Sequence, residues 1–417
     1  MKNRTIDSFL KILFHFDIIV TLSIFVTIVL SVASCSQSAK NDKNAAKDDI
    51  YPIIDLADAI ENPKKPLILS DFIEDIEYIR PEYPSSLVDF IFGISVNDDY
   101  LLLEDRDRLL CYTREGKFIR EISRKGQGPK EHLGIRSSAL YNDIIAINSN
   151  YNRKVLWYDA NGDYLDHTPV SDNVFKINIL DTNRVAIHLQ HGISMEDPGL
   201  FITGILDRNG DTIQLKKTTP YYPKGIVSSP SVWKCNDTVR VLTCLNDTVY
   251  SVTRNEITPA YIINFGEYKV SPEAFVNTRL LQEERSQYIN NYSFCETIQH
   301  LFITFQYNRK RWFSVYDKQT ANISAWSIEP DDINKYGFIK GGGWINDIDG
   351  GISPTDFHWA SSNYFVGTIL PEELKEQFQN KKNSKVKYPE KQKQLEKMVN
   401  SLNEDENPII ILYKLKK

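Results

Sequence analysis

The stretches Leu110–Ile119 (LCYTREGKFI) and Leu156–Leu165 (LWYDANGDYL) decide the fold of this chain. In each of them an apolar strand is followed by a turn with a glycine and then by a second strand. Residues 201–214 (FITGILDRNGDTIQ) have the same outline, and the three turn glycines are 46 and 48 residues apart. A period near 45 residues with about four short strands per unit is typical of the blades of a β-propeller.

Two further copies of the pattern follow, at residues 249–257 and 312–318, and the rest of the chain is long enough for a sixth. The last apolar run, Pro408–Leu415, is predicted to complete the blade begun by a strand near Phe72–Ile79. This pairing would close the ring and hide both sheet edges. We therefore predict an all-β fold, a six-bladed β-propeller over residues 51–417.

Two segments depart from the strand pattern and have helical periodicity with proline near the start. The segments near residues 272–289 and 371–402 are therefore expected to be short helical insertions in the propeller.

The first fifty residues are predicted to lie outside the propeller. Lys2 and Arg4 precede an almost wholly apolar run, Ile18–Leu30, and small residues lead directly to Cys35. This order is that of a secretory signal. We predict a signal peptide over residues 1–34, and the alternative is a plain transmembrane helix.

Residues 36–49 (SQSAKNDKNAAKDD) contain no large apolar side chain. We predict a flexible tether over residues 35–50, after the cysteine.

Charge and cysteine usage narrow the class of protein. A formal net charge of −6 argues against nucleic acid as a partner, because such proteins need a basic face. Four cysteines beside Cys35 are too few for a disulfide framework in a chain of this length. We expect buried thiols at these positions, which are Cys111, Cys235, Cys244 and Cys295.

A glycine-rich loop, Arg124–Glu131 (RKGQGPKE), follows the first repeat. Glycine loops can hold phosphate where they open a helix, but this one lies among strands and lacks the Lys-Ser/Thr that would follow. A tight turn between blades is the main expectation, with Gln127 as a candidate ligand contact. Arg309, in a basic turn before Trp312, is a second candidate contact, for an anionic ligand.

The segment Gly341–Gly351 (GGGWINDIDGG) combines glycines with acidic side chains. Asp347 and Asp349 offer the hard oxygen ligands that calcium takes, but no later glutamate completes an EF-hand. A hairpin turn is the alternative, and no cofactor is required. Trp344 in the same segment is a candidate ligand contact.

The sequence offers few candidates for catalysis. His188 and His191 have the spacing of a zinc pair, but their stretch is expected to be a strand, which favours ordinary histidines. No Gly-x-Ser-x-Gly nucleophile motif is present.

Several motifs together resemble the six-bladed β-propeller lipoproteins of Bacteroides-type bacteria, which are related in shape to NHL-repeat propellers. The motifs are Gly116–Arg120 leading into Gly126–Pro129, Asn246–Tyr250, Asn346–Gly351 and the closing Asn407–Lys416. The resemblance implies processing before Cys35, a lipid on that residue and, with Ser36 next, the outer membrane. Lys130–His132 departs from the family's Gly-Glu-Tyr, which puts the shape of that loop in doubt.

We expect a lipid-anchored binding or scaffolding module without catalysis. Its partners would be the membrane, through the lipid on Cys35, and a glycan, a peptide or an envelope protein. A ring of loops at one mouth, with Trp344, Asp347 and Asp349 among them, would be the contact surface. The alternative is a metal-dependent hydrolase or lyase with its site in the central channel, and a structural part of an envelope complex is a third possibility.

Overall fold

The fold is given by a computed structural model, which divides the chain into the units Met1–Ile50 and Tyr51–Lys417. All described residues lie in the second unit, so the predicted signal peptide, Cys35 and the tether lie outside them. The described residues are 51–82, 88, 90–171, 173–191, 200–217, 230–243, 245–271, 274, 286–328, 343–355, 361, 363–381, 385–403 and 405–416.

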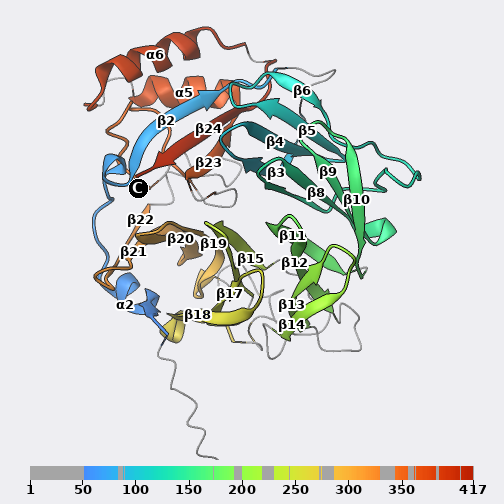
Figure 1. Ribbon diagram of the computed structural model, residues 1–417. Helices are drawn as coiled ribbons and strands as arrows, with labels where there is room; N and C mark the ends of the chain where they lie inside the picture. The colour runs from blue at the N-terminus through green and yellow to red at the C-terminus, as the bar shows by residue number, and fades with distance from the viewer. Residues whose placement is uncertain are drawn as a thin grey trace, which may run out of the picture. The chain divides into compact units, whose positions relative to one another are not determined.

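The described strands form six small sheets, which are arranged in a ring as the blades of a β-propeller (Figure 1). The predicted all-β, six-bladed fold is confirmed. Blade 1 consists of β3 (Ile91–Val96), β4 (Tyr100–Asp105), β5 (Arg108–Thr113) and β6 (Phe118–Glu121). Blade 2 consists of β7 (Ser137–Tyr141), β8 (Ile144–Ser149), β9 (Lys154–Asp159) and β10 (Tyr164–Pro169).

Blades 3 to 5 have the same antiparallel order. Blade 3 consists of β11 (Val174–Asp181), β12 (Arg184–His191), β13 (Leu200–Asp207) and β14 (Thr212–Lys217). Blade 4 consists of β15 (Ser231–Cys235), β16 (Thr238–Leu242), β17 (Thr248–Val252) and β18 (Ile257–Asn264). Blade 5 consists of β19 (Asn290–Glu296), β20 (His300–Tyr307), β21 (Lys310–Asp317) and β22 (Ile323–Ile328).

Blade 6 is built from both ends of the propeller sequence. Its described strands are β23 (Tyr364–Ile369), β24 (Ile409–Leu415) and β2 (Ile73–Ile79). The strand β24 lies between the other two and pairs antiparallel with both, so that Leu412 is opposite Glu77 on one side and Val366 on the other. The predicted closure of the ring by the last strand and an N-terminal strand is confirmed.

The repeated glycines occupy the same turn in blades 1, 2 and 3, between the third and fourth strands. Gly116, Gly162 and Gly210 have φ of 89°, 77° and 94°, and each amide donates to a carbonyl three residues earlier. The residue before each glycine does not have positive φ. The turns are therefore type I turns followed by a bulge at glycine, and the position needs a residue without Cβ.

The hydrophobic core is divided among the six interfaces between neighbouring blades. Leu101 and Leu103 of β4 pack with blade 6, whereas Leu102 between them packs with blade 2. Because each blade is covered on both faces, its inner strands are apolar on both sides, as the run YLLL shows.

An N-terminal strap, residues 51–72, crosses three blades before β2 begins. β1 (Ile53–Asp55) pairs parallel with β18, and α2 (Leu56–Glu61) packs into the core between blades 4 and 5. The amide of Lys64 then donates to the carbonyl of Ala325 in blade 5 at 2.7 Å. The sequence pattern did not distinguish this segment from the blades.

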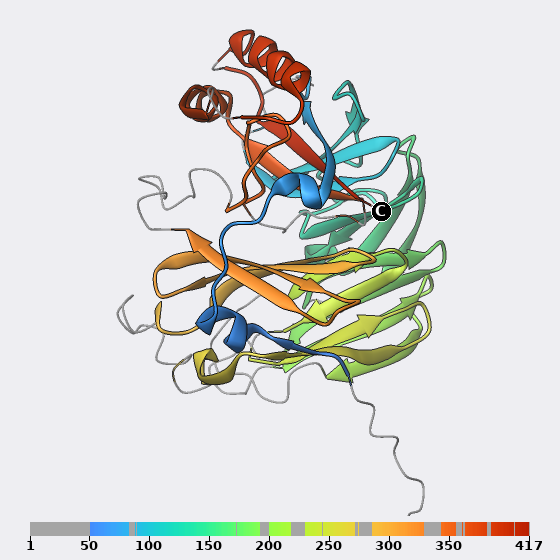
Figure 2. The same cartoon turned by 90° about the vertical axis from the view of Figure 1, so that its left-hand side faces the viewer.

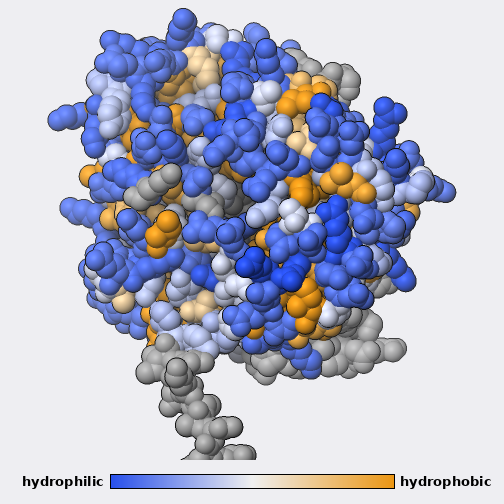
Figure 3. Space-filling model, viewed as in Figure 1, coloured by the Kyte–Doolittle hydropathy of each residue, from blue (hydrophilic) through white to orange (hydrophobic). Residues whose placement is uncertain are grey.

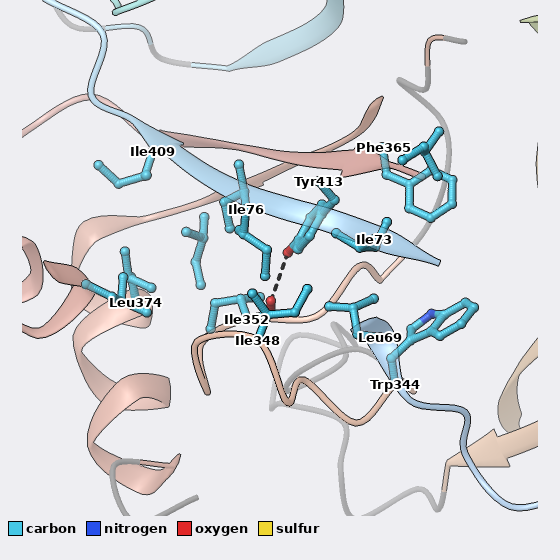
Figure 4. Packing of buried hydrophobic residues seen from close by; sticks show 14 of the residues in the cluster. Leu69, Ile73, Ile76, Trp344, Ile348, Ile352, Phe365, Leu374, Ile409 and Tyr413 are labelled. Atoms are coloured by element: carbon cyan, nitrogen blue, oxygen red, sulfur yellow. Dashed lines mark hydrogen bonds between the residues drawn. The ribbon is translucent and has the colours of Figure 1, made fainter. Parts of the chain in front are cut away.

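Two helices, α5 (Pro371–Lys381) and α6 (Pro389–Asn400), lie between β23 and β24, within the segment where helices were expected. Leu374 on α5 packs into the core between blades 5 and 6 (Figure 4). Leu395 on α6 packs into the same core. The insertion predicted near 272–289 falls mostly outside the described residues. None of the described helices is long and apolar enough to cross a membrane.

The described cysteines Cys111, Cys235 and Cys295 are buried and free, as expected. Burial raises the thiol pKa of all three, that of Cys111 to about 11. Cys244 lies outside the described residues.

Candidate functional site

The topology gives the ring two different ends. The connections between blades and the turns between second and third strands lie at one end, which we call the upper end. The other turns lie at the lower end. In the side view of Figure 2, α5 and α6 mark the upper end at the left, and the C-terminus marks the lower end at the right.

Four aromatic side chains of the described residues are exposed, and all four lie in upper-end segments. Phe90 and Phe92, at the start of β3, are 58% and 60% exposed, and their rings are 4.8 Å apart. Tyr151, in the short helix η2 (Asn150–Asn152) between β8 and β9, is 79% exposed, and Tyr388 before α6 is 40% exposed. The other described aromatic side chains are buried or half-buried.

The lower end, which faces the viewer in Figure 3, is mostly hydrophilic, with hydrophobic side chains in small separate groups. The exposed aromatic side chains thus distinguish the two ends. Exposed aromatic side chains offer large contact area at low entropic cost, which makes the upper end the better candidate for a binding surface.

The inner strands β3, β7, β11, β15 and β19 lie around the propeller axis (Figure 1). At the upper end of this inner ring, the guanidinium of Arg136 lies over the ring of Phe175, with its carbon 4.3 Å from the ring centre. Lys176, which follows Phe175 in β11, donates from Nζ to the carbonyl of Val232 in blade 4 at 3.4 Å. Burial lowers the pKa of the Lys176 amine, and the charge of Glu104 partly offsets this.

Glu104 of blade 1 is positioned by blade 2. Its Oε1 accepts hydrogen bonds from the backbone N and Oγ of Ser138, at 2.5 and 2.6 Å. The upper inner ring therefore brings together one carboxylate and two cations, from blade 1, from the start of blade 2 and from blade 3.

A second lysine of the inner ring lies near the lower end. Lys234 of β15 donates to the carbonyl of Ile179 at 3.4 Å, and its Nζ lies 4.5 Å from the ring centre of Tyr141. Burial lowers its pKa too, and nearby Asp237 partly offsets the effect. Like Lys176, Lys234 lies on an inner strand and is half-buried, but it lies at the opposite end of the ring.

Trp344 lies in the core and not on the contact surface that we expected. Its side chain is 5% exposed and packs edge to face with Trp326 at 4.9 Å, close to Leu69 (Figure 4). The flanking glycines suggested an exposed loop, but aromatic partners from other elements cover the ring.

Asp347 and Asp349 hold the chain around them through hydrogen bonds. Asp347 accepts from the backbone N and Oγ of Ser70, at 3.0 and 2.7 Å. Asp349 is 2% exposed and accepts from the hydroxyl of Tyr78 at 3.0 Å and the amide of Gly351 at 2.8 Å. Burial raises the pKa of Asp349.

Protein donors thus occupy the carboxylates on which the calcium prediction rests. In the described part of the chain, no three His, Cys, Asp or Glu side chains cluster as metal ligands. A calcium site at these two residues stays a prediction.

The glycine-rich loop surrounds a carboxylate of its own chain. Glu131 Oε2 accepts from the amide of Gly128 at 2.8 Å, and a Cβ at Gly126 would collide with the same carboxylate. This geometry supports the turn alternative over a phosphate loop. Gln127 is exposed at its tip.

Gln127 and Arg309 both lie in upper-end connections, but they belong to segments that are not neighbours in the ring. Gln127 lies between blades 1 and 2, and Arg309 lies in the turn from β20 to β21 of blade 5. The structure therefore does not bring the two candidate contacts into one site.

Sequence reasoning missed the aromatic pair Phe90 and Phe92 and the cations Arg136 and Lys176. The sequence signal for Lys176 was a single charge within the apolar strand VFKINIL. Phe90 and Phe92 gave no signal in the sequence, because apolar residues at every second position are also typical of an ordinary half-buried strand.

His188 lies within blade 3 as an ordinary buried histidine. Its Nδ1 and Nε2 are 3.3 Å from Thr203 Oγ1 and Asn178 Oδ1. Burial, together with the charge of Lys176, lowers its pKa from 6.5 to about 3. Burial also lowers the pKa of His132 and His300.

Because the pKa of His188 is lowered in the folded protein, we predict a loss of stability in mild acid. Below pH 6.5 the unfolded chain takes up a proton at His188, whereas the folded protein does not until about pH 3. The contribution of His188 to the free energy of unfolding should therefore be about 2 kcal/mol lower at pH 5 than at pH 7. Urea denaturation at both pH values measures this difference.

The matched variant is His188→Gln, which keeps hydrogen-bonding groups but does not titrate. It should have a clearly smaller difference between the two pH values. Equal differences in the variant and the unchanged protein would contradict the assignment.

A family model described as a domain of unknown function (DUF4934) matches residues 51–414. No protein with a curated description matches the chain significantly. A protein of Bacteroides fragilis that is thought to be exported has a similar structure, with 20% identity and a TM-score of 0.64, over 88% of this chain and 100% of the other. A DUF4221 protein of Bacteroides vulgatus has 11% identity and a TM-score of 0.46, over 83% and 98% of the two chains.

Proposed function

The chain belongs to the DUF4934 family, and we propose that its propeller is a non-catalytic binding module whose upper end contacts the ligand. The observation that carries this proposal is that all four exposed aromatic side chains of the described residues lie in upper-end segments. Water-exposed aromatic rings cost free energy that a partner recovers by covering them. The hydrolase or lyase alternative stays a prediction.

We also propose that the protein is exported and held at the outer membrane by a lipid on Cys35. The charged start, apolar run and small residues before Cys35 support this proposal, as does the likeness to a protein thought to be exported. The kinship with NHL-repeat propellers stays a prediction.

Binding by surface variants of the full-length protein tests the proposed function. Isothermal titration against a panel of neutral and acidic oligosaccharides and short peptides identifies the ligand first. Phe92→Ser and Tyr151→Ser should each then weaken binding by about tenfold or more, because exposed aromatic anchors dominate such contacts.

The matched control is Ile298→Ser, which removes an apolar side chain that is 70% exposed at the lower end. This variant should bind like the unchanged protein. A larger loss from Ile298→Ser than from Phe92→Ser and Tyr151→Ser would contradict the proposal.

A further inference from the structure

We infer that the upper end selects acidic glycans, and that Arg136 and Lys176 bind their carboxylate groups. This inference rests on the proposed function and names the class of ligand. It is carried by the state of these two cations in the folded protein.

Neither cation is part of an ion pair: within the described part of the chain, no carboxylate lies within ion-pair distance of Arg136 or Lys176. Among the described residues, Lys176 has only the carbonyl of Val232, at 3.4 Å, as a hydrogen-bond acceptor.

Two partly buried cations at the boundary of blades 4 and 5 are paired closely with a carboxylate. Arg240 and Lys318 both contact the carboxylate of Glu296, at 2.8 and 2.7 Å. A partly buried ammonium without an anion costs free energy, and a bound anion offsets that cost. Lys176 is therefore poised to bind an anion from outside the chain.

The two cations lie at the same end of two neighbouring inner strands. Arg136 immediately precedes β7, and Lys176 is the third residue of β11, so both lie near the upper ends of neighbouring inner strands. Phe175 covers one face of the Arg136 guanidinium. Stacking of this kind leaves the N–H edge of the group for a carboxylate, which arginine binds with two parallel hydrogen bonds.

The carboxylate of Glu104 distinguishes a glycan from a simple anion as the ligand. Glu104 accepts both Ser138 hydrogen bonds on Oε1, so Oε2 can accept from a hydroxyl group of a ligand. A carboxylate in this place would repel a ligand that carries only negative groups. A ligand with carboxylates and hydroxyls satisfies all three charged side chains.

The exposed aromatic rings at the same end favour sugar over peptide. The C–H faces of sugar rings pack against aromatic faces, while their hydroxyls reach polar groups beside them. Phe90, Phe92 and Tyr151 supply such faces at the end of the ring where Arg136 and Lys176 lie.

The test compares trigalacturonate with the neutral maltotriose in titrations of the full-length protein. Trigalacturonate should bind about tenfold tighter or more, and added sodium chloride should weaken its binding. Lys176→Met should weaken trigalacturonate binding by about tenfold or more, because a charge-assisted hydrogen bond is lost. Lys176→Arg keeps the charge and should retain most of the affinity.

The matched control is Lys234→Met, which removes the similar lysine near the lower end and should change the affinity by less than about twofold. Thermal denaturation of each variant shows that it is folded. Folding failure of Lys176→Met leaves the decision to Arg136→Gln, an exposed position that should show the same loss.

Equal binding of both trisaccharides without any effect of Lys176→Met would overturn the inference. If Phe92→Ser weakened binding in the same titrations, the proposed function would still hold. A pentaglutamate peptide that binds tighter than trigalacturonate, with the same dependence on Lys176, would overturn the glycan class. Failure of trigalacturonate to bind would also overturn the inference.

Discussion

Replacing Glu296 by alanine should lower the free energy of unfolding by about 3–5 kcal/mol. Glu296 lies at the end of β19, and its side chain is 1% exposed. Its carboxylate accepts from Arg240, Lys318 and the hydroxyl of Tyr261, the last at 2.7 Å. It therefore joins blade 4 to blade 5.

The size of the expected loss of stability follows from the two cations, Arg240 and Lys318, that remain in the Glu296→Ala protein. Burial alone would raise the pKa of Glu296, but the hydrogen bonds and charges of Arg240 and Lys318 outweigh it and hold the pKa below its usual value. Without the carboxylate, two partly buried cations remain uncompensated. Urea denaturation of the full-length protein measures the loss.

The control is the double variant Arg240→Met/Glu296→Met, measured in a cycle with both single variants. Because it removes one cation together with the carboxylate, it should be less destabilised than the sum of the single variants. Additive losses, or a loss below about 1 kcal/mol in Glu296→Ala, would contradict the account of this cluster.

Replacing Leu412 by proline should destabilise the propeller by at least about 4 kcal/mol, because proline is not tolerated in a central strand and a buried leucine is lost. Leu412 is 0% exposed and lies in β24, between β2 and β23. The change would disrupt the closure of the ring. Loss of the near-ultraviolet circular dichroism of the native protein at 25 °C would report it.

The control is Leu165→Pro in β10, an outer strand of blade 2. Leu165 is 45% exposed and falls at a register shift, so it has no paired residue in β9. This variant should lose less than about 1 kcal/mol, because edge strands and bulges tolerate proline. Similar losses in both variants would show that closure through β24 does not hold the ring.

The fold was predictable because its signals are local and repeated. The glycines at 116, 162 and 210 mark one turn in three blades, and only a residue without Cβ suits it. The apolar run at the end of the chain predicted a closing strand. β24 is buried on both faces, and a strand in such a place has apolar residues at successive positions.

The N-terminal strap and the surroundings of Trp344 were not predictable, because they depend on partners distant in sequence. Lys64 is held by Ala325, and the ring of Trp344 is covered by Trp326 and Phe302. Glycines around a tryptophan look the same in an exposed loop and in a tightly packed turn.

The candidate site was predictable only in part. The sequence predicted a contact surface of loops at one mouth with Trp344 in it, but Trp344 is buried. Gln127 and Arg309, which were predicted as separate candidate contacts, lie in upper-end connections. Lys176 gains its significance from burial and from the lack of an ion pair with a described carboxylate, which a single sequence does not show.

Hydrogen exchange of the full-length protein, measured by mass spectrometry with and without trigalacturonate, tests the central claim most directly. We predict slower exchange on binding in the upper-end peptides that contain Phe92, Arg136 and Lys176, and unchanged exchange in the lower-end peptides that contain Asn142 and Ile298. Protection confined to the lower end or to the outer strands, such as β14, would contradict the claim that the upper end of the ring binds the ligand.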